Sequence, residues 1–413
     1  MARTESRRTS VALLVATVIV VAANLRTTVQ GVGSLIDQIG GDTGLNPTLL
    51  GLLGATPLLM YALVSPLAHG ISQRFGVNRT MLVSLLVLLA ATVIRSIDAG
   101  LAPLWLGTLL TGASIAVANV LMPAVVKHWF PDRLHAIMPV YTAVLAGTGA
   151  VASGLVVPIS HVAWLDGQAG WRFALLTTGV LIIPGVVMWL AAIRRSGLDH
   201  VEGEQVEAPA RGIWRDGTAW LVALYMGFQG AAFYMLVTWL SPFSISYGTS
   251  ELQAGIEVMV MQLFSLAGSL TVPFLLRGWG RRWVPALISI PGVVGLVGLM
   301  ASPQMAWLWG AVFGYASGAM FAISMWLMAD RARNRNAATA LSGMAQSVGY
   351  VIGGIGPIAF AAAHTATGGW ALSLGLAIAC LVCLFVVGFL LRTHRFALDR
   401  APRPRSTADE PAP

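Results

Sequence analysis

Residues 10–36 read SVALLVATVIVVAANLRTTVQGVGSLI, an apolar stretch with a single charged residue, Arg26, near its middle. The stretch is long enough to cross the hydrocarbon core of a bilayer as a helix, which takes about 20 residues. An ionisable side chain at that depth costs roughly 2.5–3.5 kcal/mol on insertion scales, and a guanidinium cannot avoid the cost by losing its proton. Arg26 must therefore face protein or a water-filled cavity.

Similar apolar stretches recur along the whole chain. Of its 413 residues, 56% are hydrophobic and 10% are charged, and the mean hydropathy is +0.76. Soluble domains carry about 25% charged residues, so this composition predicts an all-α integral membrane protein. We expect twelve spans, at residues 11–36, 48–70, 80–97, 102–126, 136–160, 171–193, 217–243, 252–276, 284–301, 305–329, 337–363 and 371–391.

Positive charge is concentrated in alternate loops of this twelve-span arrangement. Of the 25 Lys and Arg residues, 22 lie in the N-terminus, the even-numbered loops or the C-terminus, and the odd-numbered loops hold Arg95 and Arg172. Because basic residues favour the cytoplasmic side, we expect an inner (plasma) membrane protein with both termini in the cytoplasm. The formal charge of +8 then reflects topology and predicts no nucleic-acid partner.

The chain divides into two halves related by a shift of about 202–204 residues. This shift places Arg74 on Arg277, Gly112 on Gly314 and Arg26 on Gln229, which indicates an internal duplication. We expect two pseudo-symmetric six-helix bundles, at residues 1–193 and 216–392. A cytoplasmic linker (194–215) would join them, and a disordered cytoplasmic tail (393–413) would follow.

This plan is similar to that of the major facilitator superfamily, whose two halves enclose a substrate near the midplane of the bilayer. The loop between the second and third spans, HGISQRFGVNR at residues 69–79, resembles the signature loop of that superfamily. Arg74 and Gly76 fit the signature, with Arg79 following, whereas Gln73 stands where an acid is usual. A basic anchor at a cytoplasmic helix end is the alternative interpretation of the two arginines.

Further motifs resemble the cyanate and 2-nitroimidazole transporter family of this superfamily. They are Asn24-Leu25-Arg26, SPLA at 65–68, NVLMP at 119–123, FPDR at 130–133 and LSGMAQSVGY at 341–350. The resemblance implies transport of a small, compact, planar or anionic solute.

Polar residues inside the spans are the candidates for solute binding. Arg26 is the candidate clamp for an anion or dipole, because guanidinium offers a planar fork of donors, and Asn24 and Gln30 flank it. A structural arginine bonded to helix carbonyls is the alternative. The other candidates are Asn119, Gln229, Phe233, Gln262, Gln346 and Tyr350, for which interhelical hydrogen bonding or aromatic packing is the competing interpretation.

Glu257 is the acid placed clearly inside a span. It could bind a coupling proton, balance the charge of Arg26, or lie at the outer edge with its carboxylate in water. The histidines lack metal-ligand spacing and the chain has no phosphate-binding glycine loop, so we expect no metal, no cofactor and no catalytic residues.

These features favour a secondary active or facilitative transporter of a small polar or anionic solute, cyanate- or nitroimidazole-like, working by alternating access. Proton-coupled efflux of toxic small molecules is the first alternative. A non-transporting receptor or enzyme on the same fold is the second. We expect the partners to be the solute, a co-transported proton and the lipid bilayer. A monomer should suffice, because one chain contains both halves.

Overall fold

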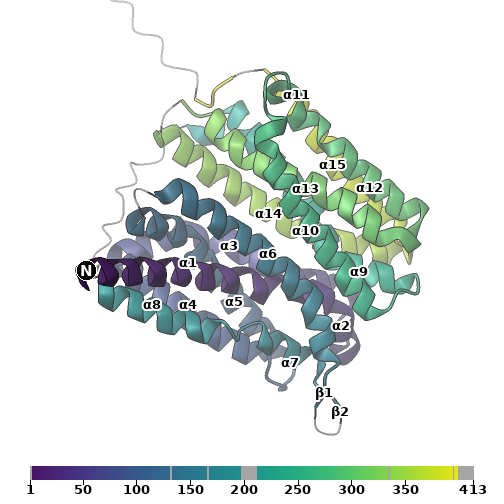
Figure 1. Cartoon of the computed structure of the whole chain (residues 1–413). Helices are drawn as coiled ribbons and strands as arrows, with labels where there is room; N and C mark the ends of the chain where they lie inside the picture. Colours follow the sequence, from purple (N-terminus) through teal and green to yellow (C-terminus); the bar gives the residue numbers. More distant parts are fainter. Residues whose placement is uncertain are drawn as a thin grey trace, which may run out of the picture.

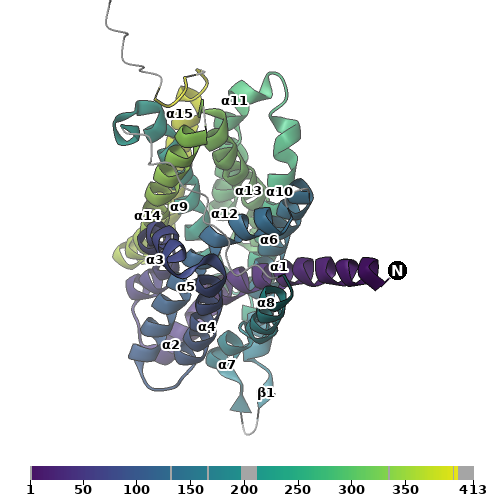
Figure 2. The ribbon, with the colours of Figure 1, turned by 90° about the vertical axis from the view of Figure 1, so that its left-hand side faces the viewer.

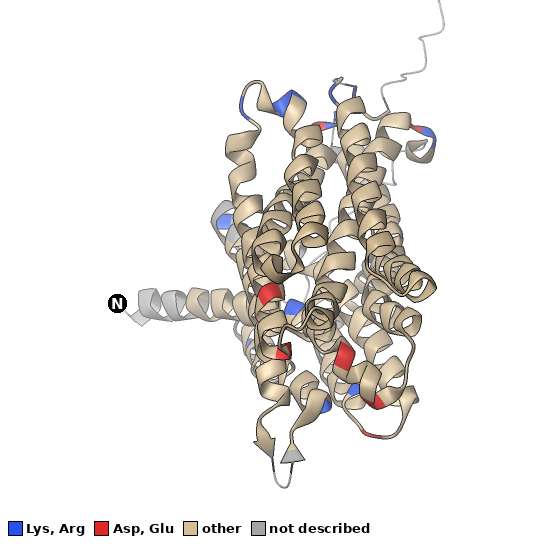
Figure 3. Ribbon diagram, turned by 90° about the vertical axis from the view of Figure 1, so that its right-hand side faces the viewer, with Lys and Arg blue, Asp and Glu red and all other residues tan. Residues whose placement is uncertain are grey.

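The computed structural model describes residues 2–130, 133–164, 167–196, 212–333, 335–393 and 395–398. It confirms the all-α membrane fold, since twelve helices or helix pairs of the described chain are long and apolar enough to cross a bilayer. Much of the predicted linker and tail, residues 197–211 and 399–413, lies outside the described residues. Charged residues occupy only a few positions along the ribbon (Figure 3).

The first group of helices runs from α1 to α8 and occupies one side of the molecule (Figure 1). A small antiparallel β-hairpin, β1 with β2, precedes α7. The elements are α1 (Ala2–Ser34), α2 (Ile36–Thr43), α3 (Pro47–Phe75), α4 (Val77–Arg95), α5 (Leu101–Trp129), α6 (Leu134–Ser160), β1 (Ala163–Trp164), β2 (Gly167–Gln168), α7 (Gly170–Thr177) and α8 (Ile182–Ser196).

The second group of helices runs from α9 to α15 and lies beside the first (Figure 1). Its elements are η2 (Ile213–Arg215), α9 (Gly217–Ser246), α10 (Glu251–Leu275), α11 (Gly280–Leu287), α12 (Ser289–Ala301), η3 (Pro303–Met305), α13 (Ala306–Asp330), α14 (Arg335–Thr367) and α15 (Ala371–Leu390). We refer to α1–α8 as the first bundle and to α9–α15 as the second. In a perpendicular view, the first bundle again lies below the second (Figure 2).

Short polar side chains fix where several spans begin. Asn46 accepts a hydrogen bond from the backbone of Leu49 at the start of α3, and Asp216 accepts one from Ala219 at the start of α9. Such caps satisfy backbone donors that have no partner inside the helix. The polar residues between the apolar stretches therefore set the length and the ends of the spans.

Two predicted spans are not single helices. The span at 171–193 is formed by α7 and α8, and the span at 284–301 is formed by α11 and α12. Proline is the physical reason, because its ring clashes with the carbonyl four residues earlier and it offers no backbone donor. Pro184 and Pro291 each lie about one turn beyond the break.

The expectation that Arg95 lies in a loop was wrong. Arg95 is the last residue of α4 and is 1% exposed. Its Nη1 donates to the carbonyl of Thr28 at 2.6 Å, and its Nη2 donates to the hydroxyl of Thr178 at 3.0 Å. Arg95 thus connects α4 to α1 and to the turn after α7.

The bundles meet mainly through two pairs of helices, α3 with α14 and α6 with α10, and α1 also contacts α9. The contact is closest at the end where α1 finishes, away from the chain terminus. There a methyl group on Gly51 would lie 2.8 Å from the carbonyl of Pro357. Leu35 and Val157 of the first bundle share one apolar core with Phe243 of the second. We call this the closed end; toward the other end, the first bundle has a separate core of its own.

Candidate functional site

A cavity of about 460 Å³ lies between the two bundles. It is lined by α1, α3, α5 and α6 of the first bundle and by α9, α10, α13 and α14 of the second. Seven of the nine residues predicted to bind solute line it. They are Arg26, Gln30, Asn119, Gln229, Phe233, Gln262 and Tyr350.

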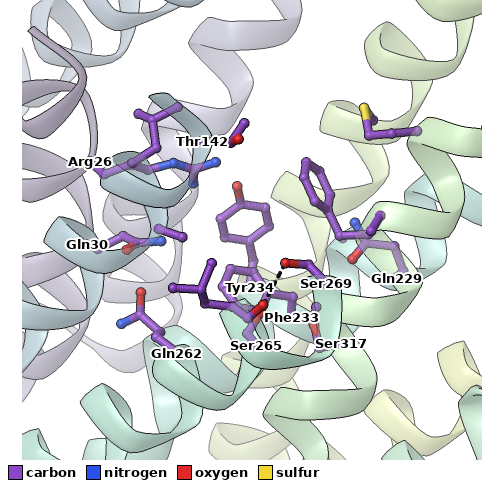
Figure 4. Close-up of a pocket in the computed structure, with 18 of the residues that line it drawn as sticks. Arg26, Gln30, Thr142, Gln229, Phe233, Tyr234, Gln262, Ser265, Ser269 and Ser317 are labelled. Atoms are coloured by element: carbon purple, nitrogen blue, oxygen red, sulfur yellow. Dashed lines mark hydrogen bonds between the residues drawn. The ribbon is translucent and has the colours of Figure 1, made fainter. Parts of the chain in front are cut away.

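Arg26 projects from α1 into this cavity (Figure 4). Tyr234 on α9 interacts with its guanidinium, and Tyr61 and Tyr350 lie nearby. Within the described part of the chain, no carboxylate forms an ion pair with Arg26. The neighbouring tyrosine hydroxyls are neutral and leave the charge of Arg26 uncompensated, so its planar fork can receive an anion or a strong acceptor.

Aromatic rings form the walls around the guanidinium. Tyr61 on α3 and Tyr350 on α14 meet edge to face across the bundle interface, with ring centroids 5.6 Å apart. Phe233 and Tyr234, consecutive on α9, make a second such pair at 5.2 Å. Edge-to-face pairs are a favourable packing of aromatic rings, and here they give the cavity flat walls beside a charged group.

Gln30 lies one turn beyond Arg26, where amides from both bundles approach each other. Gln262 on α10 donates from Nε2 to the hydroxyl of Ser153 on α6 at 2.6 Å. Ser153 in turn donates to the backbone carbonyl of Gln30 at 3.1 Å. Gln30 has room because Gly149 on α6 carries no side chain to collide with its amide. The side-chain Oε1 of Gln30 is buried and has no partner in the described structure, so it is a free acceptor.

The second bundle contributes hydroxyl groups that the sequence analysis missed. Ser265, Ser269 and Ser317 line the cavity, with Thr142 from the first bundle. Figure 4 shows Gln229 on the opposite side from Arg26, with Tyr234 between them. The i, i+3, i+7 spacing of Gln262, Ser265 and Ser269 was the available signal, because these positions share one helix face.

Three candidate residues lie outside the cavity lining. Asn24 is buried, and its amide donates to the carbonyls of Val20 and Leu181, both at 2.8 Å. Gln346 donates to the hydroxyl of Ser342 at 2.8 Å. A role for Asn24 or Gln346 in solute binding stays a prediction.

Glu257 is the third of these residues. The residue is 2% exposed, and it forms no ion pair with Arg26 in the described structure. Instead it accepts a hydrogen bond of 2.5 Å from Ser244 on α9. The carboxylate therefore lies inside the second bundle, bonded to a neutral hydroxyl.

The signature-like loop forms the turn between α3 and α4. Gly76 ends α3 with φ of +83°, a backbone conformation that favours glycine. Arg74 and Arg79 are exposed at this turn, and Arg74 lies over the ring of Phe75 at 5.4 Å. The backbone conformation of the turn therefore explains the glycine at position 76. Arg74 and Arg79 remain accessible to solvent or lipid headgroups.

Comparison with known proteins identifies the family. The model of the Major Facilitator Superfamily matches residues 14–354. The chain belongs to this superfamily. It is 35% identical to a 2-nitroimidazole transporter of Escherichia coli (strain K12), over 89% of this chain and 92% of that protein. It is 25% identical to the cyanate transport protein CynX of the same organism, over 93% of this chain and 97% of that protein.

The fold of this superfamily member is similar to that of a solved transporter structure. A bacterial homologue of the human lysosomal transporter Spinster, in an inward-facing and unoccupied conformation, superposes with a TM-score of 0.76. The match covers 94% of this chain and 97% of that one at 16% identity. The resemblance to the cyanate and 2-nitroimidazole transporters is confirmed, and the superfamily member is a multi-pass membrane transporter of small solutes rather than an enzyme.

Proposed function

We propose that this superfamily member is a secondary active or facilitative carrier of a small, polar or anionic solute, cyanate- or nitroimidazole-like, which binds in the cavity between the bundles. The central observation is Arg26, a permanent cation that lines this cavity and has no carboxylate partner in the described structure. The names of the two relatives, a 2-nitroimidazole transporter and a cyanate transport protein, support the solute class.

The chemistry of the cavity supports a compact, flat ligand. A guanidinium can donate two parallel hydrogen bonds to a carboxylate or nitro group, and low local polarity strengthens such charge-assisted bonds. Tyr61, Tyr234 and Tyr350 add hydroxyl groups and flat ring surfaces around that position. The free Oε1 of Gln30 can accept a hydrogen bond from a ring N–H or another donor on the solute. The volume of about 460 Å³ lies within the usual range of small-molecule sites.

The arrangement of the bundles supports alternating access. Close helix contacts at Gly51 and at the Ser153–Gln262 hydrogen bond hold the closed end together. We assign the chain to the inner membrane with both termini in the cytoplasm, so the closed end would face outward. One chain supplies both bundles, which makes the monomer the proposed functional unit.

Coupling to protons is part of this proposal, with Glu257 as the candidate site. Its buried carboxylate has a hydroxyl partner, Ser244, and no cation paired with it in the described residues. Ionisable groups inside membrane spans commonly mark proton pathways in transporters, which makes this carboxyl group the candidate to gain and lose a proton during transport.

Uptake into proteoliposomes tests the proposal. Purified protein is reconstituted and the entry of labelled cyanate and of labelled 2-nitroimidazole is measured with and without an inward proton gradient. We expect saturable uptake of at least one solute, lost in Arg26→Ala and absent from protein-free vesicles. Acceleration by the gradient in wild type, lost in Glu257→Gln, would support coupling. Absence of saturable uptake of both solutes would overturn the proposed solute class.

A further inference from the structure

At the closed end, the side chain of Glu251 reaches from the second bundle to the first. Glu251 is the first residue of α10, and its Oε2 accepts a hydrogen bond of 2.5 Å from Nε2 of Gln38 on α2. Nε2 of His161, which caps the end of α6, lies 3.5 Å from the same oxygen. One carboxylate oxygen therefore holds two segments of the first bundle against the second.

The hydrogen bonds of His161 fix which ring nitrogen carries a hydrogen. Nδ1 lies 2.9 Å from the carbonyl of Val157 and 3.2 Å from the hydroxyl of Ser160. Ser160 donates its own hydrogen to Val157 at 2.8 Å, so both neighbours of Nδ1 act as acceptors. Nδ1 must therefore be the donor, and a neutral ring would carry its hydrogen there.

A neutral His161 in this tautomer would turn the lone pair of Nε2 toward the carboxylate of Glu251. Two lone pairs at this position repel each other, whereas a proton between them gives an attractive pair, either imidazolium with carboxylate or imidazole with carboxylic acid. The contact seen across the bundles is therefore favourable when the His161–Glu251 pair holds one extra proton.

Asp37 is the third titratable group at this position. Desolvation by the surrounding protein and, second, the nearby charge of Glu251 raise its pKa to about 6, and the residue itself is exposed at the surface. The other acid of α2, Asp42, is bonded to Arg172 and Trp171 within the first bundle and does not cross the interface.

The remaining acid nearby along α10 is Glu257, which is hydrogen-bonded to Ser244 inside the second bundle. The side chains of His161 and Glu251 are each 42% exposed, so water at this end can deliver and remove their proton.

We propose that His161 and Glu251, with Gln38 and Asp37 beside them, form a proton-binding site between the bundles, and that the pH of the water at the closed end controls its opening. When the shared proton leaves to water, a neutral imidazole faces two carboxylates, one from each bundle, which repel each other. The site is separate from the cavity and from Glu257, and its operation does not depend on which solute is carried.

The direction of the pH effect follows from linkage. The contact across the bundles is attractive when the pair holds a proton and repulsive when it does not, so closure should be favoured at low pH and weakened as the pH rises. We expect the population that is open at this end to grow several-fold between acidic and mildly alkaline conditions.

The distance between the bundles at the closed end tests this proposal. Cys380 and Cys383 are replaced by alanine, and spin labels are attached at Ile97→Cys in the first bundle and Tyr247→Cys in the second. Both of these positions are exposed. Distances are then measured in lipid nanodiscs from pH 5.5 to pH 8. In the parent protein, the population with a longer distance should grow as the pH rises.

Two variants remove the titration while keeping polar side chains. Glu251→Gln and His161→Gln should each flatten the pH profile, because neither retains a pair that can share a proton. Asp42→Asn is the matched control and should keep the parent profile, since Asp42 bonds within one bundle. A parent profile without pH dependence, or parent-like profiles in both glutamine variants, would overturn the proposal. Thermal unfolding measurements check that each variant is folded. If one glutamine variant fails to fold, the pH profile of the other still tests the proposal.

Discussion

Gln262 on α10 donates a hydrogen bond to Ser153 on α6, with 2.6 Å between Nε2 and Oγ, and this bond links the two bundles beside Gln30. Both residues are buried, so neither group has water as a ready substitute. If the bundles separate during transport, this bond must break and its groups must be solvated. Its strength therefore contributes directly to the balance between the closed and open arrangements.

Ser153→Ala should weaken the closed end. The substitution leaves the amide of Gln262 buried without its partner, at a cost of about 1–3 kcal/mol in the closed arrangement. Distances between spin labels at the closed end should show a larger open population. Ser289→Ala is the control, because the hydroxyl of Ser289 is buried but bonds only to Ala286 within the second bundle. Equal open populations in the two variants would contradict this role of Ser153.

Tyr234→Phe should weaken solute binding without unfolding the protein. The ring can keep its packing against Phe233, but the hydroxyl beside Arg26 is lost. A hydrogen bond of this kind contributes about 1 kcal/mol, so we expect solute affinity to fall roughly fivefold. Tyr225→Phe is the control. The hydroxyl of Tyr225 lies outside the cavity and donates to the carbonyl of Pro285 at 2.9 Å, so the solute affinity of this variant should stay unchanged. Affinity would be measured by equilibrium binding of labelled solute.

Gly51→Val should favour opening of the closed end. A methyl group at Gly51 would already lie 2.8 Å from the backbone carbonyl of Pro357 on α14, and backbone cannot move aside as a flexible side chain can. We expect most molecules to leave the closed arrangement, seen as faster labelling of a cysteine placed at the interface. Gly41→Val is the control because nothing lies within 4 Å of that position. Parent-like labelling of the Gly51 variant would contradict the contact.

Arg95→Met should lower stability and spare solute binding. Arg95 is buried and donates to Thr28 and Thr178, so its loss removes bonds between three segments of the first bundle. The expected loss is about 1–3 kcal/mol, measured as a lower unfolding temperature in detergent. The exposed Arg79→Met is the control and should unfold like the parent. Weaker solute affinity in a folded Arg95 variant would show that our division between structural and binding arginines is wrong.

Much of the fold could be predicted from composition and charge placement, because apolar stretches of sufficient length must form helices in a bilayer. The breaks inside two spans were missed, since prolines are tolerated within other spans such as α3 and α14. Whether a proline bends or interrupts a helix depends on how neighbouring helices satisfy the freed backbone groups, which the sequence does not show.

The cavity residues could be predicted from sequence where a side chain had few possible environments in a membrane. A charged Arg26 has to face the interior, and the internal repeat then pointed to Gln229 as its counterpart. Asn24 was harder to place, because two residues along a helix turn the side chain by about 200°, away from Arg26 and toward α8. Nothing in the sequence requires Tyr61 or the serines of α10 to face the cavity. A tyrosine ring can pack against neighbouring helices, and a serine hydroxyl can donate to a carbonyl of its own helix.

The most direct test of the account is equilibrium binding of the transported solute to purified wild-type and Arg26→Ala protein. The account predicts a loss of affinity of roughly 10- to 150-fold, as expected for removing a charged hydrogen-bonding group, with the unfolding temperature kept close to that of the parent. Equal affinities in two well-folded proteins would contradict the claim that Arg26 anchors the solute in the cavity between the bundles.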